Sequence, residues 1–193
     1  NNKDIFSYIR TFNLEKSSVC LTTAIALSVL YIKFHVSELF FFYGFLTCLL
    51  IIVLFIDLRH EIIPNKLVLL GILSGLIYIS FDIPSRLIDS LLGMLAGSGG
   101  FFMLTVLSVM LFGTEGIGMG DVKLMSVVGL FTGVKFIIPI AVISFVLSAI
   151  TGLILIIMKI KGRKDFIPFA PFICMATYAV LIEGENILRM IEL

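Results

Sequence analysis

The distribution of apolar residues is the feature that most limits what this chain can fold into. Hydrophobic residues make up 60% of the 193 residues and charged residues only 14%, whereas a soluble domain carries about 25% charged residues. A helix that crosses a bilayer needs about 20 mostly apolar residues. Seven apolar segments can be drawn, at 17–33, 39–57, 66–81, 87–112, 121–133, 136–158 and 168–187. The sequence therefore predicts an all-α fold, a polytopic membrane bundle of about six to seven transmembrane segments.

Basic residues predict how the segments are oriented, because cytoplasmic loops of membrane proteins are enriched in Lys and Arg. If the N-terminus is cytoplasmic, ten of the fourteen basic residues fall inside, including the run KIKGRKD at 159–165. Four fall outside: Lys33, Arg86, Lys135 and Arg189. We expect residues 1–16 to form a cytoplasmic N-terminal segment and residues 17–193 a membrane-embedded domain.

Two acidic residues stand at ends of predicted segments. Asp57 lies in FIDLRHEIIPNKL (55–67), and Asp121 follows the glycines of GTEGIGMGDVKLM (113–125). Two crossings separate them, so both are predicted on the same face of the membrane, which the charge bias makes the cytoplasmic one. Taken alone, Asp121 could be a helix N-cap, and Asp57 a solvated residue where a helix leaves the bilayer.

Together the two carboxylates indicate a specific chemistry. Like charges a few Å apart cannot both ionise cheaply, so such a pair tends to share one proton. The ionised member can take a proton from water, while the protonated member polarises a carbonyl group and later protonates the leaving amine. A pair of this kind can hydrolyse a peptide bond without a metal or a covalent intermediate.

Other chemistries are less well supported by the sequence. A zinc protease helix needs His-Glu-x-x-His, and in HEIIP the second ligand position is Pro64. The other histidine, His35, is predicted on the opposite side of the membrane. The three cysteines lie far apart in apolar runs, which fits neither a metal site nor a disulfide framework. We therefore expect no metal and no cofactor, and the net charge of +1 gives no indication of nucleic-acid binding.

At this point the motifs resemble those of type IV prepilin peptidases. DLRHEIIPN resembles the first active-site segment of that family, and GTEGIGMGDVKL resembles its GxGD signature. IPFAPFI (167–173) is similar to the family's Ile-Pro-Phe-Gly-Pro-Phe segment, with Ala170 in place of the glycine. The resemblance covers roughly residues 39–172.

The resemblance implies an aspartic endopeptidase of the bacterial inner membrane that removes leader peptides from type IV prepilins or pseudopilins at the cytoplasmic face. Its expected partners are those substrates and membrane lipids. It makes Asp57 and Asp121 the catalytic pair. The supporting residues would be Gly118, Gly120, Lys123, Pro64, Asn65 and Glu115.

Several expectations stay open at this stage. Pro64 is also compatible with an ordinary helix start. Asn65 could bind a carboxylate or face water, and Lys123 could stabilise Asp121 or reach the membrane surface. Many family members also N-methylate their product. The paired CxxC motifs of such members are not seen in this sequence, which puts methylation in doubt.

Two other functions remain as alternatives. GxGD is shared with intramembrane proteases of the presenilin type, although Ile56 stands where those enzymes have a Tyr before the first Asp. A non-enzymatic proton-linked transporter or membrane scaffold is the other alternative, since acids within membrane segments can mark proton paths.

Overall fold

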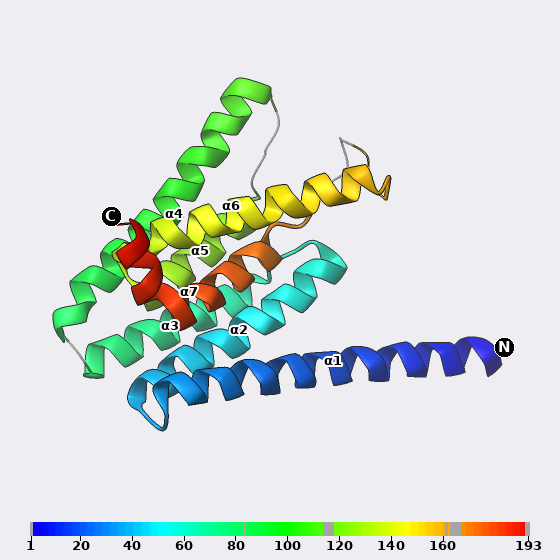
Figure 1. Ribbon diagram of the computed structural model, residues 1–193, viewed down its shortest axis with the longest axis horizontal. Coiled ribbons are helices and arrows are strands. Elements are labelled where there is room, and N and C mark those ends of the chain that lie inside the picture. The colour runs from blue at the N-terminus through cyan, green and yellow to red at the C-terminus, as the bar shows by residue number, and fades with distance from the viewer. Residues whose placement is uncertain (1, 83, 114–117, 161, 163–166, 192–193) are drawn as a thin grey trace.

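The computed structural model describes residues 2–82, 84–113, 118–160, 162 and 167–191. Within these residues the chain forms helices and no strands, which confirms the predicted all-α class. The helices are α1 (Asn2–Phe34), α2 (Glu38–His60), α3 (Asn65–Asp82), α4 (Pro84–Phe112), α5 (Met119–Thr132), α6 (Val134–Ile157) and α7 (Ala170–Ile191). Figure 1 shows them gathered into one bundle, with the N-terminal half of α1 extending beyond the others.

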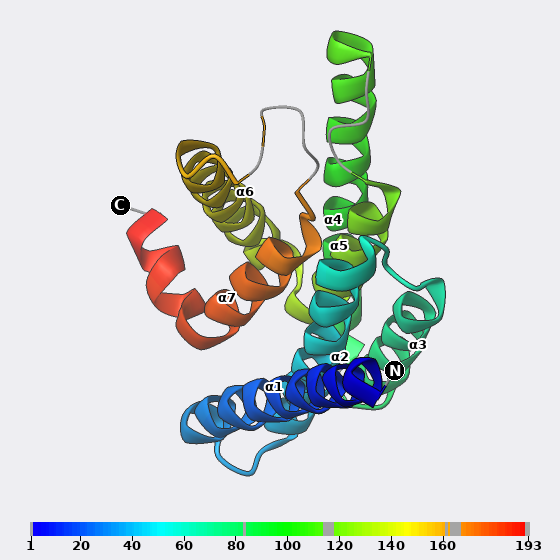
Figure 2. The same ribbon diagram turned by 90° about the vertical axis from the view of Figure 1, so that its right-hand side faces the viewer.

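Helix α5 is the centre of the bundle. It packs against α2, α3, α4, α6 and α7, and Figure 2 shows it beside α4 with other helices on several sides. Of its 14 residues, all from Asp121 to Thr132 except Lys123 are buried. A helix that is apolar on all sides is stable only when it is enclosed. The short fifth segment is therefore the core of the fold.

Glycines on two neighbouring helices allow the close approach to α5. In α4, a Cβ added to Gly93 would collide with the carbonyl oxygen of Gly129 in α5, and one at Gly97 would meet the carbonyl of Met125. In α3, a Cβ at Gly71 would lie 2.7 Å from a side-chain carbon of Val127. Gly93 and Gly97 are four residues apart, and such small residues let helices in membranes approach closely.

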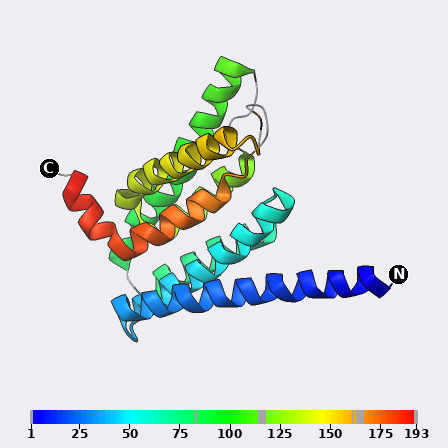
Figure 3. The ribbon, with the colours of Figure 1, turned by 45° about the vertical axis from the view of Figure 1, so that its right-hand side comes forward.

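In the part of the chain that the structure describes, four helices are long and apolar enough to cross a membrane: Ser17–Phe34 within α1, α2, Arg86–Leu111 within α4, and α6. Shorter apolar helices cover Asn65–Ser80 and Ala170–Gly184. The chain is thus a multi-pass membrane protein. Helix α1 lies on the outside of the bundle along α2 (Figure 3) and contacts it directly.

Candidate active site

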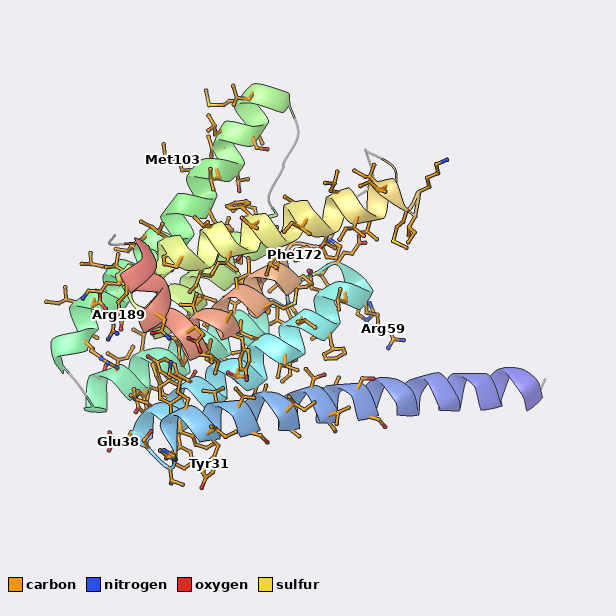
Figure 4. All side chains as sticks on the ribbon, in the orientation of Figure 1. Tyr31, Glu38, Arg59, Met103, Phe172 and Arg189 are labelled. Atoms are coloured by element: carbon orange, nitrogen blue, oxygen red, sulfur yellow. The ribbon has the colours of Figure 1, made fainter. Side chains whose placement is uncertain are left out.

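Asp57 lies in the last full turn of α2. The N–H of Glu61 donates to the Asp57 carbonyl at 2.8 Å, and Glu61 ends the helix with a left-handed φ of 54°. Although it is near a helix end, Asp57 is only 5% exposed. In Figure 4, Arg59 marks this end of α2 and points away from the bundle, while Glu38 marks the opposite end. Asp57 is therefore not the solvated residue that its position in the sequence allows.

Asp121 lies in the first turn of α5 and is 6% exposed. The N-cap of α5 is Gly118, so the helix begins two residues before the predicted segment and Asp121 is its third residue. The N–H of Gly118 donates to the Asp121 carboxylate. The side chain of the third helical residue accepts from the N-cap in the same way in one half of a capping box. The interpretation of Asp121 as the N-cap itself is wrong, because the glycine takes that position.

The two carboxylates meet in one pocket. Asp57 and Asp121 both line a cavity of about 310 Å³, together with Glu61, Ile62, Ile63, Gly118, Met119, Gly120, Lys123, Pro168 and Phe169. The charge of Asp57 acts on Asp121 there. Oδ2 of Asp57 is buried and has no hydrogen-bond partner among the described residues. A buried carboxylate oxygen without a partner is costly, and this cost falls if Asp57 shares a proton or binds water in the pocket.

The start of α7 completes one wall of this pocket. The backbone N–H of Ala170, the first residue of α7, donates to the Asp57 carboxylate. The positive end of a helix dipole stabilises an anion, so α7 offsets the unfavourable position of Asp57 near the C-terminus of α2. Ala170 is helical and fully buried, so the substitution for glycine needs no left-handed backbone. The sequence shows the IPFAPFI motif but does not by itself predict the hydrogen bond that Ala170 provides.

The GxGD motif places two glycines, Gly118 and Gly120, at the start of α5. Neither Gly118 nor Gly120 has a positive φ; φ of Gly118 is −70°. Gly120 instead allows close packing, because a Cβ there would lie 3.2 Å from the side chain of Ile63. The loop between α2 and α3 can therefore pack directly on the first turn of α5.

The side chains of Lys123 and Asn65 form a hydrogen bond. Lys123 Nζ donates to Asn65 Oδ1 at 2.9 Å, which links α5 to the first residue of α3. Asn65 is exposed, as the expectation that it faces water requires, and the side chain that it accepts from is Lys123. Pro64 directly precedes α3, and its carbonyl accepts the N–H of Leu67 at 3.0 Å. Glu115 lies outside the described residues.

The described residues offer no group of three or more His, Cys, Asp or Glu side chains that could hold a metal ion. Cys174 is buried next to the pair, and its thiol donates to the carbonyl of Leu50 at 3.3 Å. Cys20 and Cys48 are free thiols. The chemically distinctive feature of the pocket is thus its two buried carboxylates, which come from different helices.

Comparison with known proteins places this pocket in a family. A model of the type IV leader peptidase family matches residues 44–157, more than half of the chain and a range that contains both Asp57 and Asp121. This chain belongs to the type IV leader peptidase family. The resemblance found in the sequence is thereby confirmed at the level of the family.

Two of the similar proteins each carry the name prepilin leader peptidase/N-methyltransferase. The one from Xanthomonas campestris pv. campestris is 33% identical over 142 residues, which cover 74% of this chain and 50% of the relative. The one from Bacillus subtilis strain 168 is 30% identical over 173 residues, or 87% of this chain and 66% of the relative. The chain thus spans about half to two thirds of the length of these leader peptidases. No solved structure matches it significantly.

Proposed function

We propose that this chain is an aspartic endopeptidase that removes leader peptides from type IV prepilins or pseudopilins. The observation that carries the proposal is the pair Asp57 and Asp121, two buried carboxylates that line one pocket. Membership of the type IV leader peptidase family supports it, as do the names of the relatives. The proposal concerns peptide hydrolysis and does not extend to methylation.

In the proposed reaction the two carboxylates begin with one proton between them. The ionised carboxylate takes a proton from a water molecule in the pocket, and the water oxygen bonds to the carbonyl carbon of the substrate. The protonated carboxylate polarises the carbonyl oxygen. The C–N bond then breaks, the amine leaves with a proton, and the pair again holds one proton. Burial strengthens these interactions because the surroundings screen charge weakly.

The proposal also assigns an orientation. The pocket lies at the end of α2 that carries Arg59, next to the loop to α3. The charge bias of the sequence supports a cytoplasmic position for this end, and membership of the type IV leader peptidase family supports a bacterial inner membrane. A substrate whose leader is basic and cytoplasmic would then present its cleavage site at the membrane surface, near the exposed pocket residues Glu61 and Lys123.

The test is co-expression of the chain with a tagged prepilin, with leader removal read by mass spectrometry. Cleavage at the leader boundary, retained by the purified protein in detergent with EDTA, is the expected result. Cleavage within the apolar helix of the substrate would instead indicate a presenilin-type protease. Proton-coupled uptake that depends on Asp57, without any proteolysis, would replace the proposal with a transporter.

A further inference from the structure

A second polar cavity lies at the opposite end of the helices from the carboxylate pair. It measures about 160 Å³ and is lined by Lys33, Phe34, Leu39, Tyr43, Arg86, Thr132, Phe136, Val180, Leu181 and Gly184. A water molecule in the liquid takes about 30 Å³, so the cavity has room for a larger polar group. Tyr43 and Asp57 are fourteen residues apart on α2, or about 21 Å along a helix. The two cavities are thus separate sites.

Among the described residues that line it are two cations, Lys33 and Arg86, and no carboxylate. Arg86 donates a hydrogen bond to the hydroxyl oxygen of Tyr43, which leaves the hydroxyl proton of Tyr43 for another acceptor. The Lys33 ammonium lies 5.4 Å from the centre of the Phe34 ring, and the Phe34 and Tyr43 ring centres are 5.4 Å apart. Lys33 also donates to the carbonyl of Ile182. These contacts hold both cations at one cavity.

Two described acids near the cavity, Asp89 and Glu183, have other hydrogen-bond partners. Asp89, one turn after Arg86 on α4, accepts the N–H of Val134 at 3.3 Å and so caps α6. Glu183 lines a neighbouring cavity that also borders Lys33, and there it accepts from Asn186 at 2.6 Å. Within the part of the lining that the structure describes, no acid neutralises the positive charge of Lys33 and Arg86.

We propose that this cavity binds the phosphate group of an anionic ligand through Arg86, Lys33 and the hydroxyl of Tyr43. An arginine and a lysine beside a hydroxyl donor match the acceptor oxygens of a phosphate. The remaining wall is mostly apolar, with Leu39, Phe136, Val180 and Leu181. A phospholipid has both parts, a phosphate headgroup and apolar chains. Basic pockets between transmembrane helices on the cytoplasmic or matrix side bind anionic lipid headgroups, and this cavity offers the same chemistry on the side that the charge bias predicts to be the outer one.

The test uses the full chain, purified in a neutral detergent, with native mass spectrometry and thermal unfolding as readouts. The added probes are phosphatidylglycerol, phosphatidylcholine and inorganic phosphate. We expect phosphatidylglycerol to stay bound and raise the unfolding temperature, and phosphatidylcholine to do so less. Arg86→Gln and Lys33→Gln should each weaken phosphatidylglycerol binding about fivefold, the effect of one basic residue near an anionic surface. Protection by inorganic phosphate alone would assign the same site to a free phosphate.

Lys135→Gln is the matched control. Lys135 is exposed and, like Lys33 and Arg86, is one of the basic residues predicted on the outer side of the membrane. It does not line the cavity, so its loss should leave binding unchanged. An equal effect of Lys135→Gln and Arg86→Gln would overturn the proposal, because general surface charge would then explain the binding. Equal binding of both lipids, or no binding of any probe, would overturn it as well. If Arg86→Gln does not fold, Lys33→Gln decides the question.

Discussion

The backbone N–H of Ala170, at the start of α7, donates a hydrogen bond to the carboxylate of Asp57, near the end of α2. Two residues more than a hundred positions apart thus share one pocket wall. The Pro-Phe-Ala-Pro segment ends the connection from α6 and points the N-terminus of α7 at the acid. The Pro-Phe-Ala-Pro segment therefore helps to orient the buried Asp57 carboxylate.

Ala170→Pro should slow the proposed cleavage, because proline has no N–H to donate to Asp57. Proline is otherwise well accepted at the first position of a helix, and Ala170 has that position. Ala170→Gly keeps the N–H and should retain most of the activity. The measurement is the initial rate of leader removal by each purified variant, with thermal unfolding to confirm that the proline variant is folded. A folded Ala170→Pro protein with full activity would contradict a role for this hydrogen bond.

Asp57→Asn and Asp121→Asn should each reduce cleavage by at least about 10²- to 10⁴-fold, the range for loss of a general acid or base. Both side chains are buried in one pocket, and an amide cannot exchange a proton as a carboxyl group does. Prepilin cleavage is followed by mass spectrometry at matched levels of membrane-inserted protein.

Asp89→Asn is the control for the two acid variants. Asp89 caps α6 through Val134 and does not line the carboxylate pocket, so its variant should cleave normally. Normal cleavage by the Asp57→Asn or the Asp121→Asn variant would remove the substituted residue from the mechanism.

The sequence predicts the parts of this site that depend on local pattern. The apolar segments follow from hydropathy, and the two acids are placed on one face by the two segments between them. The bonds from Ala170 to Asp57 and from Lys123 to Asn65 were not predicted, because each depends on how separate helices pack. The start of α5 was placed two residues late, since glycines at a helix end carry no hydropathy signal.

Lys123→Gln and Asn65→Ala should cause similar, partial losses of activity. Each removes the 2.9 Å hydrogen bond that links α5 to α3 beside the pocket. A hydrogen bond to a charged group contributes about 1.5–3 kcal/mol, although the exposure of both residues reduces that value. The double variant should be little worse than either single one, which a double-mutant cycle of cleavage rates would measure. Strictly additive losses would mean that the two residues act separately.

Gly93→Ala should destabilise the bundle, because the added methyl group would collide with the carbonyl oxygen of Gly129 and push α4 away from α5. Overpacking of this kind costs about 1–3 kcal/mol. Gly100→Ala on the same helix is the matched control. Its Cβ would have nothing within 4 Å, and alanine in place of a helical glycine is favourable by about 0.5–1 kcal/mol. Thermal unfolding in detergent should therefore move in opposite directions for the two variants. Because α5 carries Asp121, the Gly93 variant should also lose activity at temperatures where the Gly100 variant keeps it. An unchanged unfolding temperature for Gly93→Ala would show that α4 and α5 are not held at this close distance.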